Sequence, residues 1–163
     1  MASKELLRRP FDLPVKLGDE HWSWLLEWTL GTASSFRAVF GPDEFTGFGR
    51  FEFLAFEGQP GTEVYNWTGM EGAIVVEGPI DDMARSLFRR LTQWGRHPTL
   101  WYYGLFLGNV PILDVSDWSV GGVFLTDEDV RVLREAGVPV DGWDSGVIQE
   151  DQYWDWWRSR YRP

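Results

Sequence analysis

The sequence predicts an α+β fold, with a mixed, mostly antiparallel sheet of about five to seven strands and two or three helices packed mainly on one face. Two observations lead to this prediction. Short runs of β-forming residues alternate with Gly- and Pro-rich turns, and two segments instead repeat apolar residues at helical spacing. The chain has 163 residues, 44% of them hydrophobic, so residues 1–163 are expected to form a single domain.

The clearest pattern is a strand–helix–strand unit. Residues 72–77 are β-formers, residues 80–94 have helical periodicity, and residues 99–107 are nearly all apolar. The helical stripe consists of Ile80, Met83, Ala84, Leu87, Phe88, Leu91 and Trp94. Pro79 is expected in the first helical turn and Gly95 at the C-cap. The pattern leaves open whether this helix joins parallel or antiparallel strands.

A second helix is predicted to begin after Thr126. Thr126 and Asp129 have the spacing of a capping box, with Asp in the place of the usual Glu or Gln. Gly137 is expected to end the helix, and Pro139 prevents its continuation.

A third helix is predicted over residues 19–30, with Asp19 as N-cap and Gly31 as its end. One apolar stripe contains Trp22, Leu25, Leu26 and Thr29. Trp24 and Trp28 form a second stripe, so this helix is expected either to be sandwiched or to present one face to a partner.

The remaining segments are predicted as strands and turns. Residues 48–57 and 62–68 are expected to form a hairpin around the turn at 58–61, with Phe51, Phe53 and Ala55 on one face. Further strands are predicted at residues 34–40, 73–77, 110–115 and 123–125, with turns at 69–72 and 108–109.

The two ends of the chain differ from the body. Residues 1–18 are predicted to be an irregular arm, although the alternation of Phe11, Leu13, Val15 and Leu17 also fits a sheet edge. Residues 150–163 form an aromatic C-terminal segment that is expected to be helical. Its three Trp residues within positions 154–157 cannot all point the same way, so at least one is expected to face solvent or a docking surface.

The charge distribution favours a basic protein partner. The chain carries a formal net charge of −10, whereas residues 1–16 carry +2 and Arg158, Arg160 and Arg162 add +3, which leaves −15 for residues 17–157. So acidic a body disfavours nucleic acid and anionic membranes as partners and attracts basic proteins.

Several classes of site and location are excluded or disfavoured. The chain has no Cys, which excludes disulfides, thiolate metal sites and a Cys nucleophile. No secretory h-region and no apolar run of roughly 18–20 residues is present, so a cytoplasmic location is expected. Only two of the 15 basic residues are Lys, a bias that suggests a GC-rich bacterial or phage genome.

No catalytic motif is recognisable. The only His residues, His21 and His97, are interpreted as structural, and no nucleophile elbow, zinc-protease motif or phosphate-binding loop is present. The loop acids at 114–117 and 141–144 lack the alternating oxygen ligands of a calcium loop. No catalytic residue, metal or cofactor is therefore predicted, and a non-enzyme is favoured.

The preferred hypothesis is a non-catalytic acidic protein-binding domain, an immunity-type inhibitor of a basic toxin or nuclease in a bacterial or phage setting. In composition, size and expected compartment the chain resembles bacterial immunity proteins and acidic phage inhibitors. Exposed Trp residues surrounded by acids would form the contact surface. The predicted contact residues are Trp22, Trp118, Trp143, Trp154, Trp157, Asp117, Asp141, Asp144 and Asp155.

Two alternatives remain open at this point. One is a small enzyme or binding domain for a carbohydrate or another ring-bearing ligand, with Trp stacking and paired carboxylates. Its candidate acids are Glu52, Glu57, Glu77 and Asp114. The other is a subunit of a larger assembly that docks through the aromatic C-terminus.

Overall fold

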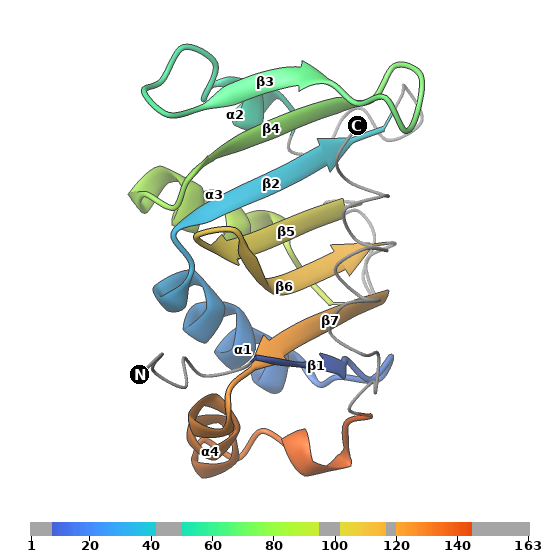
Figure 1. Cartoon of the computed structure of the whole chain (residues 1–163), viewed down its shortest axis with the longest axis vertical. Coiled ribbons are helices and arrows are strands. Elements are labelled where there is room, and N and C mark those ends of the chain that lie inside the picture. Colours follow the sequence, from blue (N-terminus) through green and yellow to red (C-terminus); the bar gives the residue numbers. More distant parts are fainter. Residues whose placement is uncertain (1–7, 42–49, 95–101, 117–119, 145–163) are drawn as a thin grey trace, which may run out of the picture.

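The computed structural model describes residues 8–41, 50–94, 102–116 and 120–144, and within them seven strands form one antiparallel sheet (Figure 1). The strands are β1 (Arg9–Asp12), β2 (Ser35–Phe40), β3 (Glu63–Asn66), β4 (Ile74–Pro79), β5 (Tyr102–Leu107), β6 (Val110–Ser116) and β7 (Val120–Leu125). Their order across the sheet is β1-β7-β6-β5-β2-β4-β3. The helices are α1 (Asp19–Thr32), α2 (Arg50–Leu54), α3 (Asp82–Leu91) and α4 (Asp127–Glu135), followed by a 3-10 turn at Val140–Gly142. The predicted α+β fold is confirmed.

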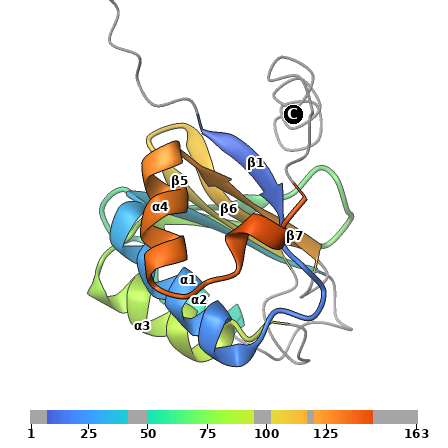
Figure 2. The same cartoon turned by 90° about the horizontal axis from the view of Figure 1, so that it is seen from below.

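The helices form a layer on one side of the sheet. In Figure 1, α1 and α3 lie behind the strands, and Figure 2 shows α1, α2 and α3 together below the sheet, with α4 toward the β7 end. The main hydrophobic core lies between these two layers and includes buried residues from α1, α3, α4 and six of the strands. Among the described helices, none is long and apolar enough to cross a bilayer.

The predicted strand–helix–strand unit is present as β4, α3 and β5. β2 lies between β4 and β5 and runs antiparallel to both, so β4 and β5 run in the same direction without being neighbours. α3 therefore connects parallel strands that are split by a third strand. Because the sequence cannot show that β2 inserts here, the direction of this connection was not predictable from residues 72–107 alone.

The start of α3 differs from the prediction. Pro79 ends β4, and the helix is capped by Asp81, whose side chain accepts a hydrogen bond from the Ala84 N–H at 2.8 Å. A side-chain cap satisfies a free backbone donor, which proline in the first turn does not do. The helix ends at Leu91 with Thr92 as C-cap, and Gly95 lies outside the described residues.

The predicted strand at 48–57 is wrong. Residues 50–54 form α2, and Phe53 and Phe56, which are three residues apart, both enter the core, whereas Ala55 is exposed. Helical spacing lets both phenyl rings reach Phe36 of β2, at centroid distances of 5.6 and 5.4 Å. Phe88 of α3 contacts the same Phe36 ring at 5.5 Å. These near edge-on contacts favour the helix over the alternating strand.

The predicted hairpin of residues 48–57 and 62–68 is therefore also wrong. β3 pairs instead with β4, and Trp67 N–H donates to the Ala73 carbonyl at 2.9 Å across the turn between them. Gly72 in this turn has a φ of 79°, a left-handed conformation that glycine adopts without strain. The predicted turns at 58–61, 69–72 and 108–109 are confirmed.

The boundaries of α1 differ from the prediction at both ends. Gly18, not Asp19, is the N-cap and makes no side-chain cap bond, and Gly31 lies inside the helix. The predicted stripe of Trp22, Leu25, Leu26 and Thr29 is buried. Trp24 and Trp28 are half-buried and pack against the same core.

The N-terminal arm is partly a strand. β1 pairs with β7 at the edge of the sheet, with buried Phe11 opposite Val123, so the irregular arm predicted over residues 1–18 is wrong for residues 9–12. The alternative expectation of a sheet edge is confirmed there. The predicted helical segment at residues 150–163 lies outside the described residues.

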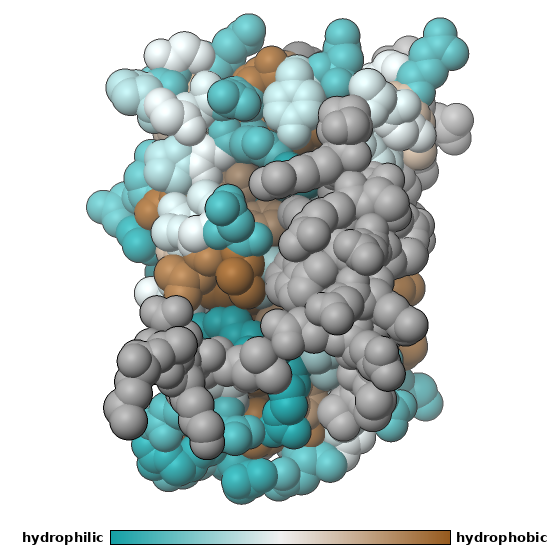
Figure 3. All heavy atoms as spheres, in the orientation of Figure 1, coloured by the Kyte–Doolittle hydropathy of each residue, from teal (hydrophilic) through white to brown (hydrophobic). Residues whose placement is uncertain are grey.

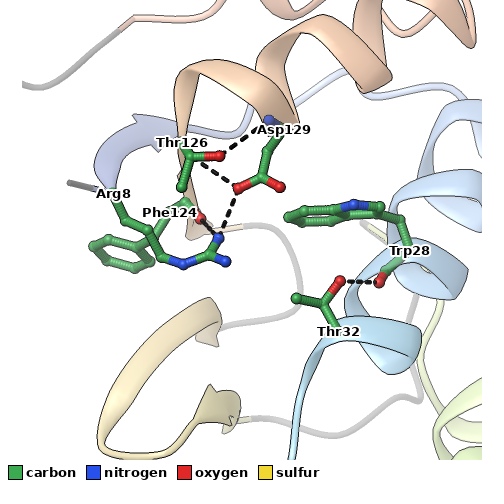
Figure 4. A network of polar contacts seen from close by, with 6 residues as sticks. All are labelled: Arg8, Trp28, Thr32, Phe124, Thr126 and Asp129. Carbon is green, nitrogen blue, oxygen red and sulfur yellow. Dashed lines mark hydrogen bonds and ion pairs between the residues drawn. The ribbon is translucent and has the colours of Figure 1, made fainter. Parts of the chain in front are cut away.

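A network of polar contacts joins β1 to α4 (Figure 4). Arg8 Nη1 donates to Asp129 Oδ2 at 2.8 Å and to the Phe124 carbonyl at 3.0 Å. Asp129 Oδ2 also accepts from Thr126 N–H at 2.8 Å, and Asp129 N–H donates to Thr126 Oγ1 at 3.1 Å. The predicted capping box is thereby confirmed. On the α1 side, Thr32 Oγ1 donates to the Trp28 carbonyl at 2.9 Å.

We expect Phe53→Ala to lower the free energy of unfolding by about 3–5 kcal/mol, because it removes one buried ring and leaves a cavity between the remaining phenyl rings. The matched variant Ala55→Glu should change it by about 0.5 kcal/mol or less, since Ala55 faces solvent. Urea denaturation measures both. A large decrease in the free energy of unfolding of Ala55→Glu would contradict α2. It would support the predicted strand instead, in which residues 53 and 55 share a face.

A double-mutant cycle with Arg8→Ala and Asp129→Ala should give a coupling energy of about 1–2 kcal/mol, because the two side chains are only 15% and 17% exposed. The control is the neighbouring Arg9–Asp127 pair, whose side chains are 51% and 89% exposed. Its coupling should be about 0.5 kcal/mol or less. Equal couplings in the two cycles would show that Arg8 does not fasten β1 to α4.

Candidate functional site

The most distinctive surface is the sheet face opposite the helix layer. Phe36 and Ala38 of β2 point into the main core, so Arg37 between them points to the other face. Residues directly opposite each other on paired strands share a face. The partners of Arg37, and their partners in turn, can therefore be followed across the whole sheet on this face. We call the resulting set the acidic row. It consists of Glu63, Glu77, Arg37, Gly104, Asp114, Gly122 and Asp12, one residue from each strand.

The acidic row has four carboxylates and one guanidinium. Asp12 and Glu63 stand at its two ends, on the edge strands β1 and β3, and both are exposed. Figure 3 looks onto this face, with hydrophilic residues at its upper and lower ends and a hydrophobic area between them. The row thus presents a line of surplus negative charge across an otherwise mixed surface.

A hollow of about 650 Å³ opens on this face where β2 begins and where β4 and β5 end. Its walls combine charged, hydroxyl and aromatic groups. They include Ser35, Arg37, Thr62, Glu63, Glu77 and Phe106. On the core side of the same strand end, Gly78 lies opposite Phe36, where a Cβ would lie 3.0 Å from Thr62 Oγ1 and 3.2 Å from the Phe36 ring.

Three side chains are locked together beside the hollow. Arg37 Nε donates to Glu77 Oε1, and Tyr65 Oη donates to the same oxygen at 2.8 Å. The Arg37 guanidinium also lies over the Phe106 ring, 5.9 Å from its centroid. Partial burial, together with the hydrogen bond to Glu77, raises the pKa of Tyr65 to about 12, so the phenol remains a neutral donor. Glu77 and Arg37 are thus satisfied by each other, while Glu63 leaves an exposed carboxylate at the rim.

The arginines do not offset this acidity at the surface. Every arginine whose side chain is described makes an ion pair with an acid of the same chain. They are Arg8, Arg9, Arg37, Arg85, Arg89, Arg90, Arg131 and Arg134. Other acids have no ion pair among the described residues, and these include Asp12, Glu20, Glu57, Glu63, Glu71 and Asp144. Within the described part of the chain, no arginine neutralises these carboxylates.

Two of the predicted contact tryptophans are core residues. Trp22 is 4% exposed and its indole N–H donates to the Thr92 carbonyl at 3.3 Å, and Trp143 is 7% exposed. The expectation that they are exposed is wrong, because each ring is large enough to fill the space beside a helix or turn. Neither offers its ring to a partner in this structure.

The predicted contact acids are placed differently from one another. Asp141 is exposed but bonded to Arg134 at 2.8 Å, and this hydrogen bond lowers the pKa of its carboxyl group. Asp144 is exposed, and its carbonyl accepts from Asp12 N–H at 2.9 Å, so it lies at one end of the acidic row. The other predicted residues lie outside the described ranges: Trp118, Trp154, Trp157, Asp117 and Asp155.

The sequence prediction missed the acidic row. Each of its charged residues follows the alternation of a strand, with apolar neighbours on both sides or on one side, which is a recognisable signal for a position facing outward. The register that aligns Glu77 with Arg37, and Arg37 with Gly104 and Asp114, depends on pairings between distant strands. No local pattern contains that information.

The candidate acids for a ring-ligand enzyme are not suitably paired. Glu77 and Asp114 share the acidic row but are three strand spacings apart, or about 14 Å. Glycosidase carboxylates lie about 5–9.5 Å apart. Glu52 belongs to α2 and lies 3.6 Å from Arg90 of α3, and Glu57 follows α2. Glu77 and Asp114 therefore do not form a catalytic pair, and Glu52 is engaged by Arg90.

A second hollow, of about 410 Å³, lies between α1 and α3 and does contain two acids and two Trp residues. The rings of Trp22 and Trp94 are packed against each other, with centroids 5.3 Å apart, and both are buried. Glu27 forms two hydrogen bonds with Arg89, at 2.6 and 2.9 Å, and these bonds lower the pKa of Glu27. The tryptophans thus offer no open face for stacking, and Glu27 is unsuited to donate a proton.

Within the described ranges, no group of three or more His, Cys, Asp or Glu residues is placed to hold a metal ion. No protein-family model matches the chain, and no curated protein or solved structure shows significant similarity to it. Functional inference therefore depends on the geometry alone.

The Tyr65→Phe variant tests the Arg37–Glu77–Tyr65 contact. A raised pKa in the folded state adds stability that is complete below about pH 10 and is lost as pH rises toward 12. Spectrophotometric titrations of the folded wild type and the folded Tyr65→Phe variant should differ by one phenol. We expect the phenol that the variant lacks to be one that ionises near pH 12 in the wild type. The same protein in denaturant is the control, where all phenols should ionise near pH 10. Loss of a component near pH 10 in the folded state would mean that Tyr65 is not held by Glu77.

Proposed function

We propose that the chain is a non-catalytic protein-binding domain that recognises a basic protein through the acidic row. The observation that supports this most is the alignment of four carboxylates with one guanidinium across the sheet face opposite α1, α2 and α3, which we call the helix-free face because no described helix covers it. A surface of one predominant sign steers an oppositely charged protein into contact and raises its association rate. The same charge disfavours nucleic acid as a direct partner.

The dimensions of the surface suit a protein better than a small molecule. Seven strands at about 4.8 Å spacing extend the acidic row over about 29 Å. Gly104 and Gly122 within it carry no side chains. The Phe106 ring fills the space over Gly104, where a Cβ would lie 2.8 Å from it, so the row combines charged positions with an aromatic surface. The hollow beside Glu63 adds a place where one projecting side chain of the partner can be received.

Within this class we favour an immunity-type inhibitor of a basic toxin or nuclease, acting in the cytoplasm of a bacterium or in a phage infection. Nucleases that bind phosphates present basic surfaces, to which a line of carboxylates is complementary. The net charge of −10 supports this choice.

The test uses the full-length chain as bait at low and at roughly physiological salt, with the wild type compared with two charge reversals. Glu63→Lys alters the acidic row, whereas Glu20→Lys makes the same change in charge at an exposed position in the first turn of α1. We expect Glu63→Lys to weaken binding of the retained partner about tenfold and Glu20→Lys to change it little. Isothermal titration with the purified partner measures the affinities.

Binding should also weaken as salt is raised, because the attraction is screened. The wild type should inhibit the activity of the isolated partner, and Glu63→Lys should inhibit it less. Equal losses in Glu63→Lys and Glu20→Lys would indicate an effect of net charge alone. That result, or binding insensitive to both, would exclude the acidic row as the contact surface.

A further inference from the structure

The helix-free face carries a second, separate hydrophobic cluster. Val39, Ala73, Val75 and Tyr102 form it, and Tyr65, Trp67 and Met70 pack around it. Val39 and Val75 are each 1% exposed although α1, α2 and α3 lie on the opposite face. Tyr65, Trp67 and Met70 cover part of this cluster, and an apolar sheet face of this kind normally packs against a further layer. Among the described elements, no helix supplies that layer.

The C-terminal segment has the composition of such a layer. Residues 150–163 contain aromatic, basic and acidic side chains, and the three acids, Glu150, Asp151 and Asp155, all precede the basic residues. The aromatic residues are Tyr153, Trp154, Trp156, Trp157 and Tyr161, and the basic residues are Arg158, Arg160 and Arg162. The second cluster is apolar, and on the same face it adjoins the acidic row through the hydrogen bond from Tyr65 to Glu77. Aromatic side chains are suited to packing on the apolar cluster, and the three arginines, which make the last six residues of the segment basic, are suited to the carboxylates of the row.

The chain is also long enough to reach this position. Asp144 is fixed beside β1, where its carbonyl accepts from Asp12 N–H at 2.9 Å. From β1 to β4 there are five strand spacings, or about 24 Å. The 13 residues from Asp144 to Trp157 span about 20 Å as a helix, which reaches β2, and about 43 Å when extended, which reaches beyond β4. The segment can therefore cross the acidic row and reach the second cluster.

We propose that residues 150–163 dock in cis on the helix-free face, with their tryptophans over the second hydrophobic cluster and their arginines toward the acidic row. This contact is independent of the proposed function, since it needs no second protein. Its consequence is that the segment borders the hollow near Glu63. A basic partner that approaches the row must bind beside the segment or displace it.

The test exploits the absence of cysteine from the chain. Ser159→Cys in the full-length protein gives a single site for a nitroxide, whose paramagnetic broadening of amide signals is read by NMR. We expect loss of amide intensity at Val39, Tyr65 and Val75, and retention at Leu25 of α1 and Ala84 of α3. Reduction of the nitroxide should restore the lost signals. Broadening confined to the helix side, or no broadening at all, would overturn the proposal.

A second set of variants tests the chemistry of the contact. In the nitroxide-labelled chain, replacing Trp154, Trp156 and Trp157 by Ala should abolish the broadening at the second cluster. Leu107→Ala, which removes an exposed apolar side chain from the end of β5, should leave it unchanged. Persistence of the broadening without the tryptophans would show that they do not cover the cluster.

A mixture of two proteins distinguishes docking in cis from docking in trans. One protein carries the nitroxide at natural isotope content, and the other carries ¹⁵N but no nitroxide. No broadening is expected in this mixture. Broadening at Val39 and Val75 of the ¹⁵N chains would show instead that the segment docks on a second copy of the chain, which would overturn docking in cis.

Discussion

The packing of Phe36 against three other phenyl rings is the contact on which the rest of the structure depends. Phe36 belongs to β2, which lies between β4 and β5, and it meets Phe53 and Phe56 beside α2 and Phe88 of α3. Each pair of rings meets at a steep angle, which suits the charge distribution of aromatic rings. One side chain thereby fixes the sheet, the crossover helix and the connection between β2 and β3 relative to one another.

The same strand determines the opposite surface. Because successive residues of a strand point to opposite faces, placing Phe36 and Ala38 in the core requires Arg37 to face outward. Arg37 then lies between Glu77 of β4 and Gly104 of β5, and Gly104 in turn lies opposite Asp114 of β6. The burial of Phe36 and Ala38 on one face of the sheet therefore places Arg37 in line with the acids of the other face. The acidic row follows from this arrangement.

Local patterns predicted the elements whose signals are contained within a few residues. The capping box of α4, the apolar stripe of α3 and the glycine at position 137 are of this kind. Residues 50–56 were misassigned because Phe51, Phe53 and Ala55 alternate like a strand while Phe53 and Phe56 also have helical spacing. Only the presence of Phe36 and Phe88 favours the helix. The burial of Trp22 and Trp143, and the alignment of the acidic row, likewise depend on distant parts of the chain, which composition and periodicity do not contain.

The pairing of β1 with β7 has a consequence for the order of folding. The contact between Arg8 and Phe124 joins residues 116 positions apart, and Arg8 also binds Asp129 at the start of α4. During synthesis the N-terminal residues emerge first, yet their strand partner is among the last described elements to appear. The sheet therefore closes at its β1 edge only after β7 is in place, and loop-closure entropy makes this a late and slow step. Until then, the outer edge of β7 stays open to other strands, and the ribosome-bound chain is most exposed to mispairing there.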